Sequence, residues 1–199
     1  MLLLRHGQTA MSVQKRYAGV SDVPLTDTGI RQAAAAAKRL AGAGIDVIVT
    51  SPLQRATRTA QEVAAVTGVP VMTDEGFRET DFGAWEGLTF AEVRERWPAE
   101  VTSWLADPAV APPGGESFAE VSERVSAALH RVLAERDRQT VLVVSHVTPI
   151  KSLVVAALLA PPPALYRMHL DVAALCEIDW YADGPAILRS FNDTAHLPR

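Results

Sequence analysis

Residues 2–9 read Leu2-Leu3-Leu4-Arg5-His6-Gly7-Gln8-Thr9, so that three apolar residues lead directly into an arginine and a histidine. A short run that is wholly apolar is typical of a central strand buried on both faces of a sheet. In open α/β sheets, ligands bind just beyond the carboxyl ends of the strands. The stretch therefore predicts a buried strand that delivers Arg5 and His6 to a binding site.

Outward from this strand, apolar strands alternate with amphipathic helices along the chain. Further buried strands are expected at residues 47–49, 69–72 and 141–144, and helices at 26–41, at 54–66, from 117 onward and at about 150–159. Capping-box pairs mark two helix starts, Thr89 with Glu92 and Ser117 with Glu120. The pattern favours a three-layer α/β/α fold with a mostly parallel central sheet.

The end of the chain has a different pattern. Residues 175–181 and 186–191 flank Ala182-Asp183-Gly184-Pro185, which suggests a terminal β-hairpin. Proline-rich breaks near 108–113 and 161–163 are interpreted as loops within the domain. No repeat, charge block or long linker divides the sequence, so a single domain is expected over residues 1–199.

Composition excludes several classes of protein. Of the 199 residues, 48% are hydrophobic and 21% are charged, which is typical of a folded chain. The net charge of −4 argues against nucleic-acid binding, since no basic surplus can neutralise a phosphate backbone. The single cysteine, Cys176, allows no internal disulfide and is interpreted as a buried strand residue. No apolar run approaches the roughly 20 residues that span a bilayer, so a cytoplasmic protein without membrane contact is expected.

Polar and charged residues follow the four predicted central strands. Arg5 and His6 come after the first strand, Arg55 after the second, Glu79 after the third and His146 after the fourth. A phosphate dianion needs fixed cationic donors, and guanidinium groups match its oxygens in a bidentate way. Transfer of a phosphoryl group also needs a nucleophile and a proton donor for the leaving oxygen. Two arginines, two histidines and one carboxylate meet these needs without a metal or another cofactor.

A single histidine after a strand is more often a structural hydrogen-bonding group than a catalytic one. His6 and His146, however, end two different buried strands, and arginines follow two of the strand ends, which favours a shared site. His130, His169 and His196 are interpreted as structural or surface residues. The sequence holds no His-x-His, His-x-x-x-His or Cys-x-x-Cys spacing, so no metal site is expected.

At these residues the sequence resembles a known family. Leu4-Arg5-His6-Gly7-Gln8-Thr9 resembles the signature of the histidine phosphatase superfamily, which has the phosphoglycerate mutase-like fold. The likeness extends in family order over Asp22-Val23-Pro24-Leu25-Thr26, Ser51-Pro52-Leu53-Gln54-Arg55-Ala56, Glu79-Thr80-Asp81-Phe82-Gly83-Ala84-Trp85-Glu86-Gly87, Pro113-Gly114-Gly115-Glu116-Ser117 and Ser145-His146, and so covers essentially the whole chain. It implies that His6 is the phosphorylated nucleophile, that Arg5, Arg55 and His146 bind the phosphoryl group, and that Glu79 is the proton donor and later the base.

Two positions depart from the family pattern. Ser12 stands where the family often has asparagine, and Val147-Thr148-Pro149 follows His146 where the family often has glycine. A serine hydroxyl could still donate to a phosphate oxygen with a shorter reach, and Thr148 could supply a backbone or hydroxyl donor. Ser12 and Thr148 are therefore candidate phosphate-binding residues.

Within the superfamily, the sequence most resembles the phosphatase domain of bifunctional ribonuclease H/acid phosphatase proteins, and also α-ribazole phosphatases. Ser12, residues 145–151 and residues 192–197 carry this likeness. The likeness implies a phosphatase domain cut from a longer protein with an N-terminal ribonuclease H-like domain, although a genuine short start stays open.

The residues and the resemblance together predict a metal-independent phosphomonoesterase of the acid phosphatase type. Its substrate would be a small phosphorylated metabolite, with α-ribazole phosphate as one candidate. Two alternatives stay open, a phosphoglycerate mutase and a non-catalytic phosphate-binding module. Aromatic residues are predicted either to line an apolar wall for a ring-bearing alcohol or simply to pack; they are Tyr17, Trp85, Phe90 and Trp104.

Overall fold

A six-stranded sheet lies at the centre of the computed structural model, which describes residues 1–134, 136, 138–181 and 183–198. In chain order its strands are β1 (Leu2–Arg5), β2 (Val47–Thr50), β3 (Val71–Thr73), β4 (Val141–Ser145), β5 (Leu175–Trp180) and β6 (Ala186–Asp193). Their order across the sheet is β3-β2-β4-β1-β5-β6. The first four of these are mutually parallel, and β5 runs antiparallel to both β1 and β6. The predictions of a mostly parallel sheet and of a terminal hairpin are confirmed, although Ala182 of the hairpin loop lies outside the described residues.

Helices connect the strands. They are α1 (Ala10–Val13), α2 (Asp27–Leu40), α3 (Gln54–Thr67), α4 (Phe90–Arg96), α5 (Pro98–Ala106), α6 (Phe118–Ala134) and α7 (Val147–Ala157), with the short 3₁₀ turns η1 (Glu75–Phe77), η2 (Gly83–Trp85) and η3 (Pro162–Arg167). Both predicted capping boxes are present, since the paired side chains and backbone N–H groups bond reciprocally at Thr89 and at Ser117. Within the described residues, no helix is both long and apolar enough to cross a membrane.

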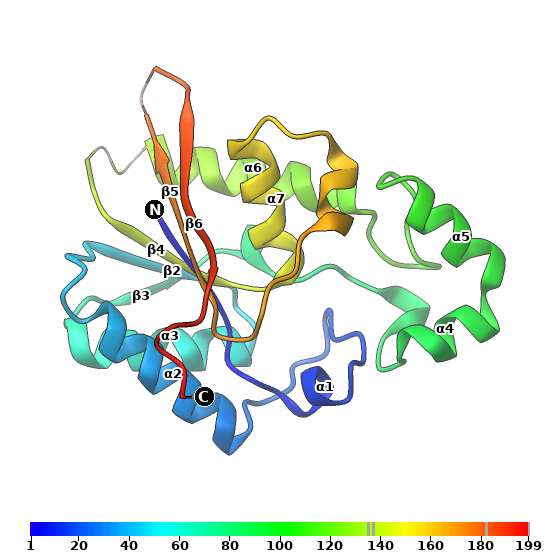
Figure 1. The fold of residues 1–199 in the computed structure, drawn as a ribbon, viewed down its shortest axis with the longest axis horizontal. Helices are drawn as coiled ribbons and strands as arrows, with labels where there is room; N and C mark the ends of the chain where they lie inside the picture. The colour runs from blue at the N-terminus through cyan, green and yellow to red at the C-terminus, as the bar shows by residue number, and fades with distance from the viewer. Residues whose placement is uncertain (135, 137, 182, 199) are drawn as a thin grey trace.

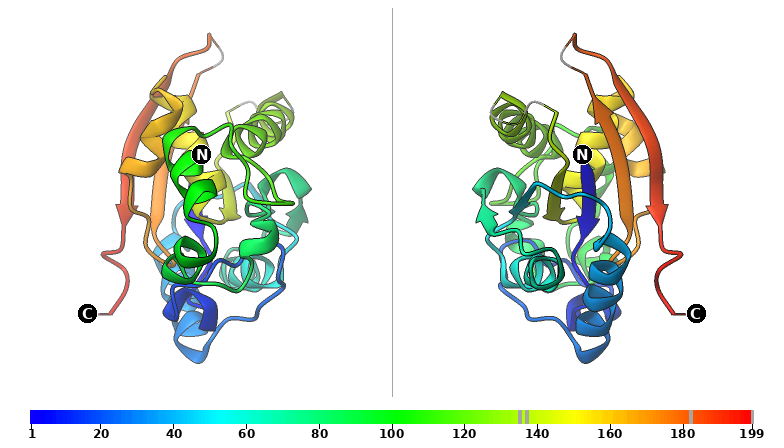
Figure 2. Two further views of the ribbon diagram at one scale, coloured as in Figure 1. Left: turned by 90° about the vertical axis from the view of Figure 1, so that its right-hand side faces the viewer. Right: turned by 90° about the vertical axis from the view of Figure 1, so that its left-hand side faces the viewer.

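Three layers result from this arrangement, with α2 and α3 on one face of the sheet and α6 and α7 on the other (Figures 1 and 2). Successive strand residues point to opposite faces. Leu3 accordingly packs with Val143 and the α6–α7 layer, whereas Leu4 packs with Val144 and the α2–α3 layer. Both leucines are fully buried, which is why the predicted strand had to be wholly apolar.

The register of β1 against β4 places the strand ends side by side. Arg5 pairs with Ser145, so the two residues that follow them, His6 and His146, leave the sheet together. The backbone N–H of His6 also donates to the Ser145 carbonyl at 3.0 Å. Two histidines 140 positions apart in the sequence are therefore neighbours because parallel strands end at the same edge.

The observed elements differ from the expected ones in several places, and the short helix α1 was not predicted. Helix α7 begins at Val147 instead of near residue 150, directly after His146. Strand β3 is shorter than expected and lies at the sheet edge, where Met72 is exposed. Helix α5 was not predicted, although Pro98 at its first turn is a favourable start signal. The apolar residues of α5 do not recur at a clear helical spacing, so the sequence pattern did not indicate a helix there.

Helices α4 and α5 extend away from the sheet and pack against a separate aromatic core (Figure 1). Phe82, Trp85, Trp104 and Phe118 are buried there together, and Tyr17 packs against them. Trp85 is fully buried and meets Trp104 edge-on, with ring centroids 5.4 Å apart. This lobe covers one side of the space beyond the carboxyl ends of β1 and β4.

Candidate active site

His6 and His146 form the centre of the site. Their ring centroids are 5.1 Å apart, and both side chains are buried. The Nδ1 atom of His6 lies 2.7 Å from the carbonyl oxygen of Gly7. Because a carbonyl can only accept, Nδ1 carries the proton and Nε2 keeps a free lone pair.

The charge of His6 is set by its surroundings. Burial, and then the positive charges of Arg5 and Arg55, hold the pKa of His6 well below its ordinary value of 6.5. The ring is therefore neutral at neutral pH, with Nε2 unprotonated. A neutral imidazole with a free nitrogen beside two cations is a suitable nucleophile for a phosphorus atom.

His146 has the same tautomer, but with different partners. Its Nε2 lies 2.7 Å from Ser51 Oγ, and this oxygen also accepts from the backbone N–H of Leu53 at 3.3 Å. Within the described residues, Nε2 is the acceptor available to the hydroxyl proton of Ser51, so neutral His146 carries its own proton on Nδ1. That Nδ1 atom is buried and has no partner among the described residues. Burial, followed by Arg55 and His6, keeps the pKa of His146 well below 6.5, so the ring offers an N–H donor without adding charge.

We expect Ser51→Ala to change the tautomer of His146. Without the hydroxyl donor, part of the population should move its proton to Nε2, and kcat/KM should fall about tenfold, the effect of one hydrogen bond. Nitrogen-15 NMR of the histidine rings distinguishes the two tautomers directly. Thr57→Ala, which removes an exposed hydroxyl that donates to the Gln54 carbonyl within the described part of the chain, is the control and should change neither readout. An Nε2-protonated His146 in the unmodified protein would contradict the assignment.

Arg5 and Arg55 are fixed by backbone carbonyls. Arg5 Nη1 donates to the Leu170 carbonyl at 2.6 Å. The two terminal nitrogens of Arg55 donate to three carbonyls of segment 18–21 at 2.8–2.9 Å. In both side chains Nε is buried and has no partner in the described part of the chain, so a donor remains for a bound anion. Burial lowers the pKa of Arg5 to about 10, which leaves it charged at neutral pH.

Glu86 holds the segment that positions Arg55. Its two carboxylate oxygens accept from the backbone N–H groups of Gly19 and Ser21, each at 3.0 Å. Asp81 accepts from the backbone of Gly83 at 2.9 Å. Both carboxylates are thus bonded within loops, as expected for residues without a direct chemical role.

Glu79 lies at the N-terminus of α7. Its oxygens accept from the backbone N–H groups of Thr80 at 2.9 Å, Val147 at 3.0 Å and Thr148 at 3.2 Å. A carboxylate at this end of a helix satisfies free N–H groups and interacts favourably with the helix dipole. This capping explains why α7 begins at Val147, and it brings Glu79 into the same pocket as His6.

The two candidate donors, Ser12 and Thr148, both line this pocket. The hydroxyl of Ser12 donates to the carbonyl of Thr9 at 2.8 Å and accepts from its N–H at 2.9 Å. A contact between Ser12 and phosphate would therefore require this pairing to break. The backbone N–H of Thr148 is already given to Glu79 at 3.2 Å, so only its hydroxyl is left to contact a phosphate oxygen.

The pocket has a volume of about 240 Å³ and two chemically different sides. The polar side is lined by Arg5, His6, Arg55 and Glu79, and the aromatic side by Tyr17, Phe82, Trp104 and Phe118. Of the two possibilities left open for the aromatic residues, Tyr17 and Trp104 line the pocket, whereas Trp85 only packs and Phe90 does neither. Trp85 lies behind the wall in the lobe core, and Phe90 is exposed at the start of α4. Phe82 and Phe118 were missed, although both fall in or beside the segments that resemble the family.

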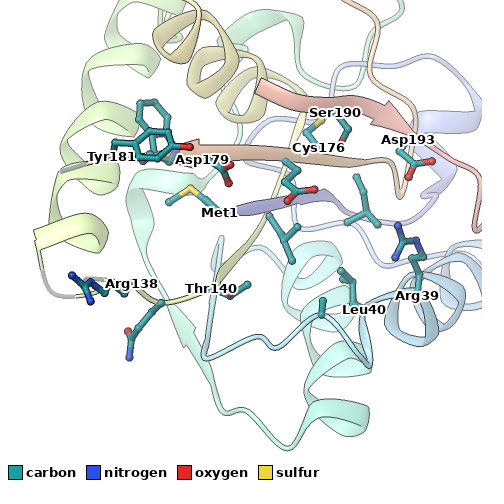
Figure 3. A pocket seen from close by; sticks show the side chains of 16 residues that line it. Met1, Arg39, Leu40, Arg138, Thr140, Cys176, Asp179, Tyr181, Ser190 and Asp193 are labelled. Atoms are coloured by element: carbon teal, nitrogen blue, oxygen red, sulfur yellow. The ribbon is translucent and has the colours of Figure 1, made fainter. Parts of the chain in front are cut away.

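A larger hollow of about 550 Å³ lies at the opposite, amino-terminal ends of β1 and β4, beside Met1 and Thr140 (Figure 3). Its charged side chains are of mixed sign and include Arg39, Asp179 and Asp193. Asp179 is already bonded to Arg189 at 2.6 Å. Among the described residues that line this hollow there is no histidine, and no set of groups comparable to that around His6.

The remaining polar residues lie as the sequence suggested. His130 is exposed on α6, His169 pairs with Asp171 on the surface, and His196 bonds the Ala173 carbonyl. Cys176 is buried in β5, where burial raises its pKa to about 11. Across the described residues, no three His, Cys, Asp or Glu side chains gather as a metal-binding group.

The sequence profile of the histidine phosphatase superfamily (branch 1) matches residues 1–194. The chain belongs to this superfamily, and its enzyme class is that of the phosphoric monoester hydrolases. It is 50% identical over 198 residues to the bifunctional protein Rv2228c of Mycobacterium tuberculosis, a match that covers 99% of this chain and 54% of that protein. The chain thus spans about half the length of the curated relatives that it matches at this level.

Two further similarities bear on function. The probable phosphoglycerate mutase GpmB of Cronobacter sakazakii is 36% identical over 203 residues, with 98% of this chain and 93% of that protein covered. The solved structure of mycobacterial glucosyl-3-phosphoglycerate phosphatase Rv2419c with VO3 has a TM-score of 0.90 and 31% identity, with 98% of this chain and 99% of that chain covered. The predicted fold and family are confirmed, and the relatives include both phosphatase and mutase names.

Proposed function

We propose that this chain is a metal-independent phosphomonoesterase that works through a phosphohistidine on His6. The observation that carries the proposal is the neutral imidazole of His6, whose Nε2 is free, in a pocket that is also lined by two arginines with unpartnered Nε atoms. In the first step Nε2 attacks phosphorus, and the ester P–O bond breaks. The leaving oxygen takes a proton from Glu79. In the second step water attacks phosphorus, the N–P bond breaks, and Glu79 recovers a proton from that water.

The charges around the pocket support this sequence of steps. Arg5 and Arg55 carry two positive charges, and the phosphoryl group that is transferred is negative. The arginines therefore stabilise the charge of the transition state electrostatically. His146 adds a neutral N–H donor at Nδ1. Because the pKa of His6 lies below 6.5, its lone pair stays available in mildly acidic solution, where an unshifted histidine would be largely protonated. This supports an activity of the acid phosphatase type.

Activity is expected to survive removal of divalent metals. Phosphate release from p-nitrophenyl phosphate should be unchanged after dialysis against a chelator, since two guanidinium groups supply the positive charge. Vanadate should inhibit as a transition-state mimic and bind at least about 100-fold more tightly than the substrate. A reversible loss of activity that magnesium or zinc restores would refute metal independence.

The alternatives make different products. A phosphoglycerate mutase would interconvert the two phosphoglycerate isomers and release little phosphate, and a non-catalytic module would do neither. Both a nucleophile and a carboxylate lie in the same pocket, which favours catalysis over simple binding. Incubation with 3-phosphoglycerate and a trace of its bisphosphate, followed by analysis of the products, separates these cases.

The finer assignments are parts of the same proposal. α-Ribazole phosphate is a candidate substrate because its ring-bearing alcohol suits an aromatic wall, and it belongs in the first substrate panel. A ribonuclease H-like domain before this one in a longer protein is supported by the similarity to a relative that is called bifunctional. A cytoplasmic location stays a prediction of the sequence.

A further inference from the structure

The aromatic wall, which consists of Tyr17, Phe82, Trp104 and Phe118, faces the space where the alcohol part of a phosphomonoester would lie. Tyr17 and Phe82 have ring centroids 4.6 Å apart, and Trp104 and Phe118 have centroids 5.1 Å apart. The wall is held from behind by the lobe core, so it is a continuous and well-packed surface. Stacking on such rings favours a flat, apolar partner.

Among the described residues that line the pocket, Arg16 is the cation on the aromatic side, and it is already paired. Arg16 Nη1 donates to a carboxylate oxygen of Glu92 and to the Gly87 carbonyl, both at 2.8 Å, and its Nε donates to Gln14. Glu92 cannot easily turn away, because the same oxygen accepts from the backbone N–H of Thr89 at 2.7 Å in the capping box of α4. Arg16 therefore already has a carboxylate counter-ion and two further acceptors before a substrate arrives.

The other cations of the pocket are committed to the phosphoryl group. Arg5 and Arg55 lie on the polar side with His6, and the carboxyl group there, that of Glu79, offers no positive charge. A second negative group on the substrate, such as a carboxylate, would meet aromatic faces and no unpaired cation among the described lining residues. Burying a charge without a partner is unfavourable, whereas burying a ring is favourable.

We propose that the substrate is a phosphomonoester of an uncharged alcohol that bears an aromatic ring, and that phosphomonoesters with a carboxylate are poor substrates. This inference rests on the proposed phosphatase function and names its substrate class. It distinguishes this chain from the relatives whose names contain phosphoglycerate, a carboxylate-bearing group.

The first test compares esters with similarly poor leaving groups. The value of kcat/KM for 2-phenylethyl phosphate should exceed that for glycerol 3-phosphate by at least about tenfold, as expected for one or two ring contacts. It should exceed the value for 3-phosphoglycerate by a larger factor. Equal values, or a preference for 3-phosphoglycerate, would overturn the inference.

Variants of the wall test which residues cause the preference. Tyr17→Leu and Phe118→Leu remove a ring but keep an apolar side chain, so each should reduce the preference for 2-phenylethyl phosphate about threefold to tenfold. Phe90→Leu is the matched control, because Phe90 is exposed on α4 and does not line the pocket. An equal loss of preference in the Phe90 variant would contradict the role of the wall.

Glu92→Gln tests whether the pairing of Arg16 limits the activity on a carboxylate-bearing ester, and the expected result is a gain of that activity. Glutamine preserves the capping box, but it leaves the charge of Arg16 without its counter-ion. The activity on 3-phosphoglycerate relative to 2-phenylethyl phosphate should rise about threefold, a typical effect of an exposed ion pair. An unchanged ratio would show that Arg16 is not the limiting charge.

The failure of this inference is distinguishable from failure of the proposed function. If no ester in the panel releases phosphate, including p-nitrophenyl phosphate, the phosphatase proposal itself is wrong. If phosphate is released but the ring gives no advantage, the phosphatase proposal stands and only the substrate class is wrong.

Discussion

Replacing His6 by alanine is expected to lower kcat for phosphate release by at least about 10⁴-fold, because the loss of a nucleophile removes the covalent route entirely. The geometry gives the reason, since Nδ1 is tied to the Gly7 carbonyl and Nε2 is the free nitrogen. No other nucleophile of comparable strength lines the described part of the pocket.

The same change should barely affect stability. Within the described residues, the His6 side chain makes one hydrogen bond and does not belong to the hydrophobic clusters that hold the layers together. Arg5 and Arg55 also disfavour its protonated form, so no stabilising ion pair is lost. A loss of about 1 kcal/mol would lower the melting temperature of a chain of this size by about 2–4 °C.

Two measurements check this prediction together. A brief reaction with a ³²P-labelled ester, quenched in alkali, should leave label on the unmodified protein and none on the His6→Ala variant, since phosphohistidine is labile to acid. His130→Ala, on the exposed face of α6, is the control and should keep both label and turnover. Substantial turnover by His6→Ala, or label that persists in it, would refute the phosphohistidine mechanism.

Much of the fold could be predicted because its signals are local. The apolar run before Arg5 marks a strand buried on both faces, and the capping boxes at Thr89 and Ser117 mark helix starts. The edge position of β3 and the presence of α5 were not predicted, because both depend on what lies beside them in space. Local patterns carry no information about a neighbour that is distant in the sequence.

In the site, too, residues with a local sequence signal were predicted, and contacts between distant residues were not. His6, Arg5, Arg55, His146 and Glu79 were found because strand ends and family motifs mark them. Their partners were not found, since Ser51 with His146 and Glu86 with segment 18–21 meet only in the folded chain. Glu92 had a visible signal, but as a capping residue it gave no hint of its pairing with Arg16.

Glu79→Gln is expected to slow the hydrolysis of alkyl phosphates by about 10²–10⁴-fold, the usual contribution of a general acid. Hydrolysis of p-nitrophenyl phosphate should fall much less, because a nitrophenolate can leave without a proton and an alkoxide cannot. The informative quantity is therefore the ratio of the two losses, measured as kcat/KM on 2-phenylethyl phosphate and on p-nitrophenyl phosphate.

The ratio is needed because the variant also disturbs the structure. Both oxygens of Glu79 accept backbone N–H groups, so one end of a glutamine amide must turn its NH₂ toward a donor, most favourably toward that of Val147. An unsatisfied buried donor costs about 1–3 kcal/mol and would slow both esters alike through altered geometry. A structural effect thus cancels in the ratio, whereas the loss of a proton donor does not.

The neighbouring carboxylates supply the controls, and the structure predicts different results for the two. Asp81→Asn should leave both rates nearly unchanged, because the hydrogen bond that its carboxylate makes within the described residues is to the Gly83 backbone, which an asparagine oxygen can also accept. Glu86→Gln should slow both esters equally, since Glu86 holds the segment that fixes Arg55, and that arginine is needed whatever the leaving group. If Glu79→Gln also slows both esters equally, or if one of these neighbours shows the selective loss, then Glu79 is only the cap of α7 and another group protonates the leaving oxygen.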